Sequence, residues 1–345
     1  MIQKQFAQAL DGISHVYMRF QKKRQAKIFF EGGMKEFLED ADVTDPMKFF
    51  ANPGIVPEVE ITKTVRRSRY NLNFFRYESF VETPHRPNNT VHGRLYEIHG
   101  KPDAPTVIVL HGWHMESYNF FDHYCRLLVH SGFNAALVDL PYHMNRRVPN
   151  SFHGEYTFSD DAVLTVLVMK QCVLDVEGTI NWVKSRGARE IGMFGISYGG
   201  MLSGLVGCVE PSVDFMMLVA PPADLFDFFT ESRLGRLFES QNPRMFEEMK
   251  RNKEVFDRIS LVNLTPQMPP ERIFLVMAEY DGMVRSEMIE KLWHAWDRPH
   301  MERYLHGHLS VILFNPSMHR DMRRWLKTVY DPEAQASQSP SAGKS

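Results

Sequence analysis

The sequence predicts an α/β fold in which a mostly parallel central sheet carries helices on both faces. Short apolar runs at 106–110, 134–138 and 191–194 are typical of buried parallel strands. Segments whose apolar residues recur at helical spacing lie between these runs, as expected of strands joined by crossover helices. The pentapeptide at 195–199 follows the third run directly and predicts a sharp turn from strand to helix.

The expected elements follow the chain in one consistent order. A strand pair at 70–81 and 91–98 is joined by a turn-rich segment. Further strands are expected at 106–110, 134–138, 191–194, 213–219, 272–277 and 301–305. Helices are expected at 121–130, 173–187, 288–296 and 318–329, and after residue 199. Catalytic groups in such sheets gather at the carboxyl ends of the strands.

The segment 222–270 is longer than one crossover helix needs and is rich in large apolar side chains. It predicts a helical cap insertion that excludes water and lines an apolar pocket, although ordinary helix packing would use the same residues. The proposed domains are therefore a helical extension (1–64), a main domain (65–330) that carries the insertion, and a disordered tail (331–345) rich in Ser, Pro, Ala and Gln.

The N-terminal extension contains a basic cluster between Lys22 and Lys27. The cluster would suit attachment to an anionic membrane surface, but we favour a helix packed on the main domain with a solvated charged face.

The composition indicates a globular protein and argues against several other classes of protein. The 345 residues, 43% hydrophobic and 24% charged, are enough for a large globular core. A formal net charge of −2 argues against nucleic-acid binding. Neither a secretory signal nor a membrane-spanning run is expected, and three cysteines without pairing or metal-ligand spacing favour a reducing, cytoplasmic location. No phosphate-binding or dinucleotide fingerprint is present, so we expect no cofactor.

Gly195-Ile196-Ser197-Tyr198-Gly199 is the most informative motif. Ser197 is expected in a strained turn that lifts its hydroxyl clear of the backbone, where side chains at 195 and 199 would collide. A serine hydroxyl needs a nearby base to become a nucleophile, and histidine suits that task near neutral pH.

The base is expected on a loop after the last strand, where His306 and His308 are the candidates. We prefer His308 because Gly307 frees the turn before it, whereas His319 lies within the last helix and suits a structural role. The histidine needs an anionic partner to fix its tautomer. Asp281, just past the strand 272–277, is the preferred acid, although it would also suit a helix cap or a turn.

Asp224 and Asp227 are the alternative acids. Donors for a developing oxyanion are expected from the backbone N–H groups of Tyr198 and Trp113. A metal site at His111 and His114 is the other interpretation of that loop. We disfavour it because no carboxylate or cysteine lies at ligand spacing, and we expect no metal.

These motifs together resemble the α/β-hydrolase-fold serine hydrolases. His111-Gly112-Trp113, the pentapeptide, Asp281 and His308 match the oxyanion loop, nucleophile elbow, acid and base of that superfamily in chain order, over about residues 65–330. The segment 139–149 is similar to one in an uncharacterised branch of α/β-hydrolase-domain proteins. The resemblance implies the α/β-hydrolase fold and a catalytic triad, but no substrate.

The segment 139–149 should border the active-site edge. Arg146 and Arg147, assisted by His143, would suit a clamp for a carboxylate or phosphate on the substrate. The alternative is that they are surface arginines in a structural ion pair. The predicted function is hydrolysis of a small-molecule ester, or of a thioester or amide. The alternatives are an acyltransferase on the same triad and a non-catalytic binding protein.

Overall fold

The structure is a computed structural model that describes residues 2–20, 29–30, 33–40 and 45–330. The basic cluster at 22–27 and the tail at 331–345 lie outside the described residues. Within the described ranges, no helix combines the length and the apolar character needed to cross a bilayer.

The described strands form one nine-stranded sheet in the order β1-β2-β3-β5-β4-β6-β7-β8-β9. The first three strands and the β3–β5 pair are antiparallel, and all pairs from β5 to β9 are parallel. The predicted fold class is therefore confirmed. The strands are β1 (Glu60–Arg66), β2 (Tyr70–Glu78), β3 (Thr90–Ile98), β4 (Thr106–Leu110), β5 (Asn134–Val138), β6 (Ile191–Ile196), β7 (Phe215–Val219), β8 (Ile273–Ala278) and β9 (His300–Tyr304).

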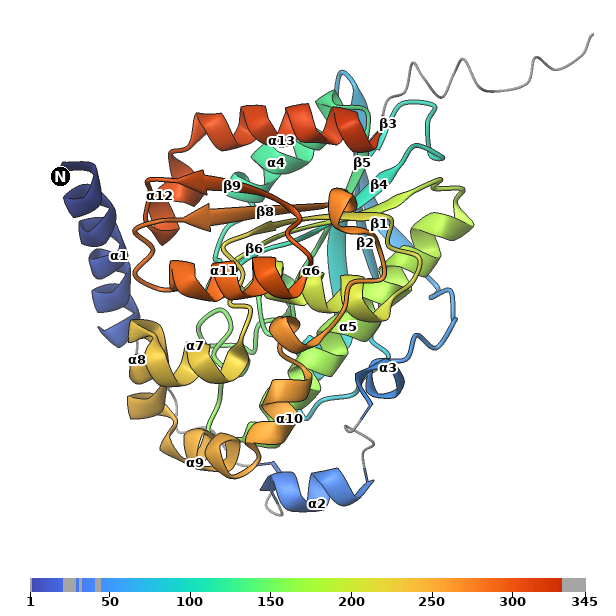
Figure 1. The fold of residues 1–345 in the computed structure, drawn as a ribbon. Coiled ribbons are helices and arrows are strands. Elements are labelled where there is room, and N and C mark those ends of the chain that lie inside the picture. The colour runs from blue at the N-terminus through green and yellow to red at the C-terminus, as the bar shows by residue number, and fades with distance from the viewer. Residues whose placement is uncertain (1, 21–28, 31–32, 41–44, 331–345) are drawn as a thin grey trace, which may run out of the picture.

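Helices cover both faces of the sheet (Figure 1). One face carries α4 (Asn119–His130) and α13 (Pro316–Val329), and the other carries α5 (Ala162–Ser185), α6 (Tyr198–Val209) and α11 (Ser286–Ala295). The alternation of side chains along a strand divides the core accordingly. Val107 and Val109 of β4 pack toward the first face, while Ile108 and Leu110 pack toward the second.

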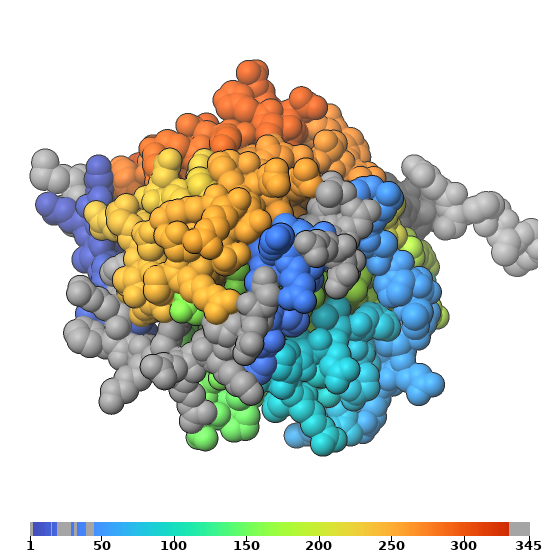
Figure 2. Space-filling view, turned by 90° about the horizontal axis from the view of Figure 1, so that it is seen from below, coloured from blue at the N-terminus to red at the C-terminus, as the bar shows by residue number. Residues whose placement is uncertain are grey.

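The segment between β7 and β8 is helical, as expected. It contains α7 (Leu225–Glu231), α8 (Arg233–Gln241), α9 (Pro243–Arg251) and α10 (Lys253–Arg258), followed by two short 3₁₀ turns. The N-terminal helices are α1 (Ile2–Phe20), α2 (Gly33–Asp40) and α3 (Pro46–Phe49). Both views place α1 beside the helical insert (Figures 1 and 2).

The expected boundary at residue 64/65 is wrong, because it falls inside the edge strand β1. Six of the seven residues of β1 are exposed, so burial imposes no alternation of apolar and polar residues there. The buried strands β4 and β5, in contrast, coincide with the ranges expected from their apolar runs.

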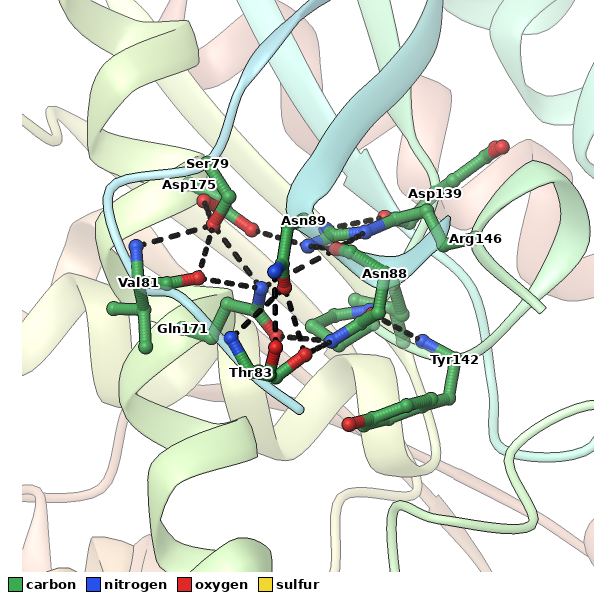
Figure 3. A network of polar contacts seen from close by, with 12 residues as sticks. Ser79, Val81, Thr83, Asn88, Asn89, Asp139, Tyr142, Arg146, Gln171 and Asp175 are labelled. Atoms are coloured by element: carbon green, nitrogen blue, oxygen red, sulfur yellow. Dashed lines mark hydrogen bonds and ion pairs between the residues drawn. The ribbon is translucent and has the colours of Figure 1, made fainter. Parts of the chain in front are cut away.

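Arg146 lies in a buried polar network rather than at a substrate site (Figure 3). Its guanidinium is fully buried and forms a 2.8 Å ion pair with Asp175 of α5. It also donates to the backbone carbonyls of Asn88 and Asp139, and Ser79 donates to the other carboxylate oxygen of Asp175. The clamp expected of Arg146 is therefore wrong. The alternative is right about the structural ion pair, but it is wrong about the surface position, because Arg146 is buried. The arginine ties the β5–α5 loop to α5 and to the connection between β2 and β3.

We expect Arg146→Ala to lower the free energy of unfolding by about 3–5 kcal/mol, because it leaves the Asp175 carboxylate buried without its partner. The measurement is urea denaturation followed by tryptophan fluorescence. The matched control is Arg147→Ala, since Arg147 is exposed and donates only to the carbonyl of Ser151, and it should cost far less. Equal losses in the two variants would contradict a structural role specific to Arg146.

Candidate active site

Ser197 lies at a strained turn between β6 and α6. Its φ of 55° and ψ of −121° are a conformation that residues with a side chain rarely adopt. A Cβ at Gly195 would approach the carbonyl oxygen of Gly199 to 2.1 Å, and a Cβ at Gly199 would approach the carbonyl oxygen of His111 to 2.3 Å. The backbone N–H of Ser197 donates to Val219 on β7 at 2.8 Å. The two glycines therefore permit the turn, and the sheet holds it.

The structure brings Ser197, His308 and Asp281 together. Ser197 Oγ lies 2.9 Å from His308 Nε2, and His308 Nδ1 lies 2.7 Å from Asp281 Oδ2. Asp281 follows β8, and its other oxygen accepts from the backbone N–H groups of Met283 and Val284 at 2.8 and 2.7 Å. His308 is the first residue of α12 (His308–Leu313), so the expectation that it lies on a loop is wrong by one residue.

The surroundings of His308 favour its protonated form. Burial disfavours the imidazolium, but the adjacent Asp281 carboxylate, together with Asp11, outweighs burial and raises the pKa of His308 above its ordinary value. The two carboxylates would therefore stabilise the imidazolium that forms if His308 accepts a proton from the Ser197 hydroxyl. The arrangement thus has the parts of a nucleophile, a base and an orienting acid.

The alternative base and acid candidates lie elsewhere. His306 uses its carbonyl to accept from the N–H of Tyr280. Asp224 and Asp227 both pair with Lys291, at 2.7 and 3.2 Å.

His319 of α13 contacts the hydroxyl of Tyr124 at 3.2 Å. This histidine is held between α13 and α4, in keeping with the structural role expected of it.

The loop after β4 lies against the serine turn. The ideal Cβ position of Gly112 is 3.8 Å from Ser197 Cβ, so the backbone of this loop passes close to the nucleophile. Trp113 and Tyr198, whose backbone N–H groups are the expected oxyanion donors, both line the cavity beside Ser197. The Trp113 ring is fixed separately, because its Nε1 donates to the carbonyl of Gly154 at 3.0 Å.

His111 and His143 connect this loop to the loop after β5 through hydrogen bonds, and neither side chain lines the cavity. His111 Nε2 accepts from the backbone N–H of Leu140, and His143 Nε2 accepts from that of His114, each at 3.1 Å. Both rings are buried, and burial lowers the pKa of His111 to about 4 and that of His143 well below its ordinary value. The substrate contact expected of His143 is therefore wrong, because a neutral buried ring that accepts a loop amide is a support.

Arg147 does not line the cavity either, so the predicted clamp has no member there. No group of three or more potential metal-ligating side chains occurs among the residues that the structure describes.

An apolar cavity of about 240 Å³ opens beside Ser197. The helical insert supplies one wall through Leu225, Phe228, Leu234 and Phe238. Phe158 and Trp113 pack against Phe238, with ring centroids 5.1 and 4.9 Å apart. Further lining side chains come from the loop after β4 and from α12, and they include Met115, Leu309, Ile312 and Leu313.

Sequence reasoning missed the contribution of α1. Ser14, Tyr17 and Met18 line the cavity, and the buried Asp11 contacts the two loops that carry Asp281 and His308. An amphipathic pattern predicts that a helix packs, but it does not specify the partner surface. The lone acid at position 11, on an otherwise uncharged stretch from Gln5 to Val16, was the available signal.

Gly154 was missed as well. Its φ is +82°, and a Cβ there would lie 2.5 Å from the His143 ring and 2.6 Å from the Trp113 indole nitrogen. The close approach of these two rings requires glycine.

Solved structures with the same fold include several esterases and a peptidase. An acetyl xylan esterase from Paenibacillus sp. R4 is 15% identical, with a TM-score of 0.62 over 88% of this chain and 96% of that one. Acetyl xylan esterase 1 from Thermoanaerobacterium sp. JW/SL YS485 is 14% identical, with a TM-score of 0.60 over 91% and 98%. The acylaminoacyl peptidase of Pyrococcus horikoshii has a TM-score of 0.54 at 14% identity, over 75% of this chain and 40% of that one. At such identities the likeness concerns the fold alone.

Sequence comparison gives a relative and a family. The Mycobacterium tuberculosis protein named "Uncharacterized protein Rv2627c" is 27% identical over 328 residues, which cover 87% of this chain and 73% of the relative. The family model "Alpha/beta hydrolase domain containing 18" matches residues 58–236, a span that includes the Trp113 loop and the Ser197 turn and ends before Asp281 and His308. The chain belongs to this family of α/β-hydrolase domain proteins.

Proposed function

We propose that this protein is a serine hydrolase that cleaves an ester of a small molecule with an apolar acyl or aryl group. The observation that carries the proposal is the 2.9 Å contact between Ser197 Oγ and His308 Nε2 in the wall of an apolar cavity, with His308 held by Asp281. The α/β-hydrolase family and fold support the same class of reaction.

The proposed reaction has two stages. Ser197 attacks the acyl carbon while His308 accepts its proton, and Asp281 stabilises the resulting imidazolium. The backbone N–H groups of Tyr198 and Trp113 stabilise the oxyanion of the tetrahedral intermediate. The imidazolium then protonates the leaving alkoxide, and water, activated by the same histidine, releases the acid from the acyl-enzyme. An ester suits this site better than an amide, because an alkoxide leaves more readily than an amine.

The first prediction concerns the nucleophile. A fluorophosphonate probe should label the wild-type protein but not Ser197→Ala. Ser197→Ala, His308→Gln and Asp281→Asn should each lower kcat for a p-nitrophenyl ester at least about 1,000-fold, because each removes a different part of one proton-transfer unit. The matched control is Ser203→Ala, which removes a buried hydroxyl without a hydrogen-bond partner four residues past the elbow's second glycine, Gly199.

Retained labelling of Ser197→Ala, or loss of labelling in Ser203→Ala, would contradict the assignment. Wild-type protein that takes no label would favour the binding-protein alternative. Transfer of the acyl group to an added alcohol in preference to water, measured by product analysis, would favour the acyltransferase alternative.

The second prediction concerns pH. His308 must be neutral to accept the serine proton, and its pKa is raised because Asp281 and Asp11 outweigh the effect of burial. We therefore expect kcat/KM to rise with pH through an apparent pKa above the ordinary value of histidine, about 6.5. A full pH profile from pH 5 to 9 with a neutral ester measures it, and an acid limb centred below that value would contradict the electrostatic assignment.

The third prediction concerns the acyl group. Along a p-nitrophenyl series from acetate upward, kcat/KM should rise about threefold to fourfold per methylene until the cavity is filled, since each buried methylene contributes about 0.8 kcal/mol. Leu234→Trp should reduce kcat/KM for the best long ester about tenfold by filling the cavity, and should leave acetate within about twofold. If Leu234→Trp reduced kcat/KM equally for acetate and for the long ester, the result would contradict binding of the acyl group in this cavity.

A further inference from the structure

Asp11 of α1 is buried at the junction of the two loops that carry Asp281 and His308. Its Oδ2 accepts from the backbone N–H groups of Gly282 and His308, each at 3.0 Å, and its Oδ1 accepts from that of Leu309 at 3.0 Å. Its relative exposure is 5%, and nothing in the proposed reaction steps uses it. One side chain from the start of the chain thus bridges the residue after the acid and the backbone of the base.

We propose that Asp11 is a positioning residue for the hydrolysis, and that α1 is therefore a working part of the active site rather than an added helix. The inference rests on the proposed function, because it assigns Asp11 to the same Ser197, His308 and Asp281 unit. Asp11 touches neither the substrate nor the serine and acts through His308.

The hydrogen bonds account for how Asp11 acts. The Gly282 and His308 amides share one carboxylate oxygen, so the β8–α11 loop and the start of α12 are held at a fixed separation. That separation sets the 2.7 Å contact between His308 and Asp281. A ring that shifts by a fraction of an ångström loses alignment with its serine, and small displacements of this kind lower kcat strongly.

The two loops are shaped to receive α1. A Cβ at Gly307 would approach Asp11 Oδ2 to 2.8 Å and Ala7 Cβ to 3.1 Å, although the φ of Gly307, −90°, suits any residue. A Cβ at Gly282 would lie 3.4 Å from Asp11 Oδ2. Glycine at 307 therefore leaves space for the helix, and the buried Ala7 fills that space.

The same helix completes the cavity wall beyond Asp11. Met18 is buried against the core, and Ser14 and Tyr17 line the cavity together with residues of the helical insert. Both views show α1 running along this edge of the molecule, next to the insert (Figures 1 and 2). Packing of α1 on the main domain thus positions His308 through Asp11. The same helix also supplies part of the wall of the apolar cavity.

The charge of Asp11 adds to its geometry. The groups that face His308 are Ser197 from the elbow, Asp281 from the β8–α11 loop and Asp11 from α1. Burial lowers the pKa of His308, and the two carboxylates raise it, Asp281 more than Asp11. Removal of the Asp11 charge should therefore lower the pKa of His308, whereas a mere loss of packing would not move it in that direction.

The test compares Asp11→Asn with the wild type in the full chain. We expect kcat to fall about tenfold with KM within about twofold, because the base is misplaced while the acyl pocket remains. The acid limb of kcat/KM should move to lower pH. NMR titration of ¹⁵N-histidine-labelled protein, with the His308 signal identified by its loss in His308→Gln, should show a lower pKa for that ring.

The matched control is Asp161→Asn. Asp161 is buried, caps α5 through the N–H of Leu164, and accepts from the N–H groups of Phe29 and Phe30. It therefore makes the same number of backbone contacts as Asp11, and like Asp11 it links the N-terminal segment to the main domain. Thermal unfolding should show comparable destabilisation of the two variants, while only Asp11→Asn changes kcat and the His308 pKa.

A second variant separates position from charge. Gly307→Ala keeps the Asp11 carboxylate but forces it and Ala7 away from His308. We expect Gly307→Ala to lower kcat, and its loss to combine less than additively with that of Asp11→Asn, because both break the same contact.

The outcomes are distinguishable. An unchanged His308 pKa together with wild-type kcat in Asp11→Asn, or additive losses in the double variant, would overturn the role of Asp11. A wild-type protein that takes no fluorophosphonate label would instead overturn the proposed function. The NMR titration would still decide whether Asp11 acts on His308, since it requires no turnover.

Discussion

The hydrogen bond between Ser197 and His308 depends on the parallel pairing of β6 to β9. In that arrangement Ile196 of β6 lies opposite Val219, Val219 lies opposite Val276, and Ala278 of β8 lies opposite Tyr304 of β9. The carboxyl ends of these strands therefore meet at one edge, and the loops after them deliver the serine, the acid and the base. The strands β6, β7 and β8 are buried along their whole length. A slip of one residue in a pair of them would turn every side chain of that strand to the other face, so the packing on the two faces specifies their register.

Closing that edge buries several charged and polar side chains, and the buried Arg146, His111 and His143 all have partners. The β5–α5 loop, which supports the loop after β4 through His143, is anchored by the ion pair of Arg146 with Asp175. Burial keeps His111 and His143 neutral, so they accept amide protons without adding positive charge behind the nucleophile. Asp281 and Asp11 supply the negative charge that favours the imidazolium of His308, and the insert contributes aromatic side chains to the cavity wall.

Sequence reasoning succeeded where one local constraint dominates. The strands β4 and β5 are buried on both faces, so their apolar runs coincide with the observed bounds. The pentapeptide predicted the turn at Ser197 because only glycine fits at 195 and 199. The exposed edge strand β1 lacked any such constraint and was missed.

Contacts between charged residues and partners far away in the chain could not be predicted from local sequence patterns. Arg146 has the chemistry of an anion clamp, and only the fold shows that its partner is Asp175 on the next helix rather than a substrate. Asp11 belongs to a helix whose pattern predicts packing on some surface. Its partners are backbone amides nearly 300 residues later, and backbone amides leave no mark in a sequence.

Two segments that lie far apart in the chain, α1 and the insert between β7 and β8, enclose the cavity beside Ser197. The sheet alone leaves the carboxyl ends of its strands open to water, where an ion pair such as His308–Asp281 is strongly screened. The insert between β7 and β8 closes one side with aromatic rings, and α1 closes the other with Met18 and Tyr17. Exclusion of water by these two walls strengthens the attraction between imidazolium and carboxylate, so the helices outside the sheet control the basicity of the histidine that the sheet positions.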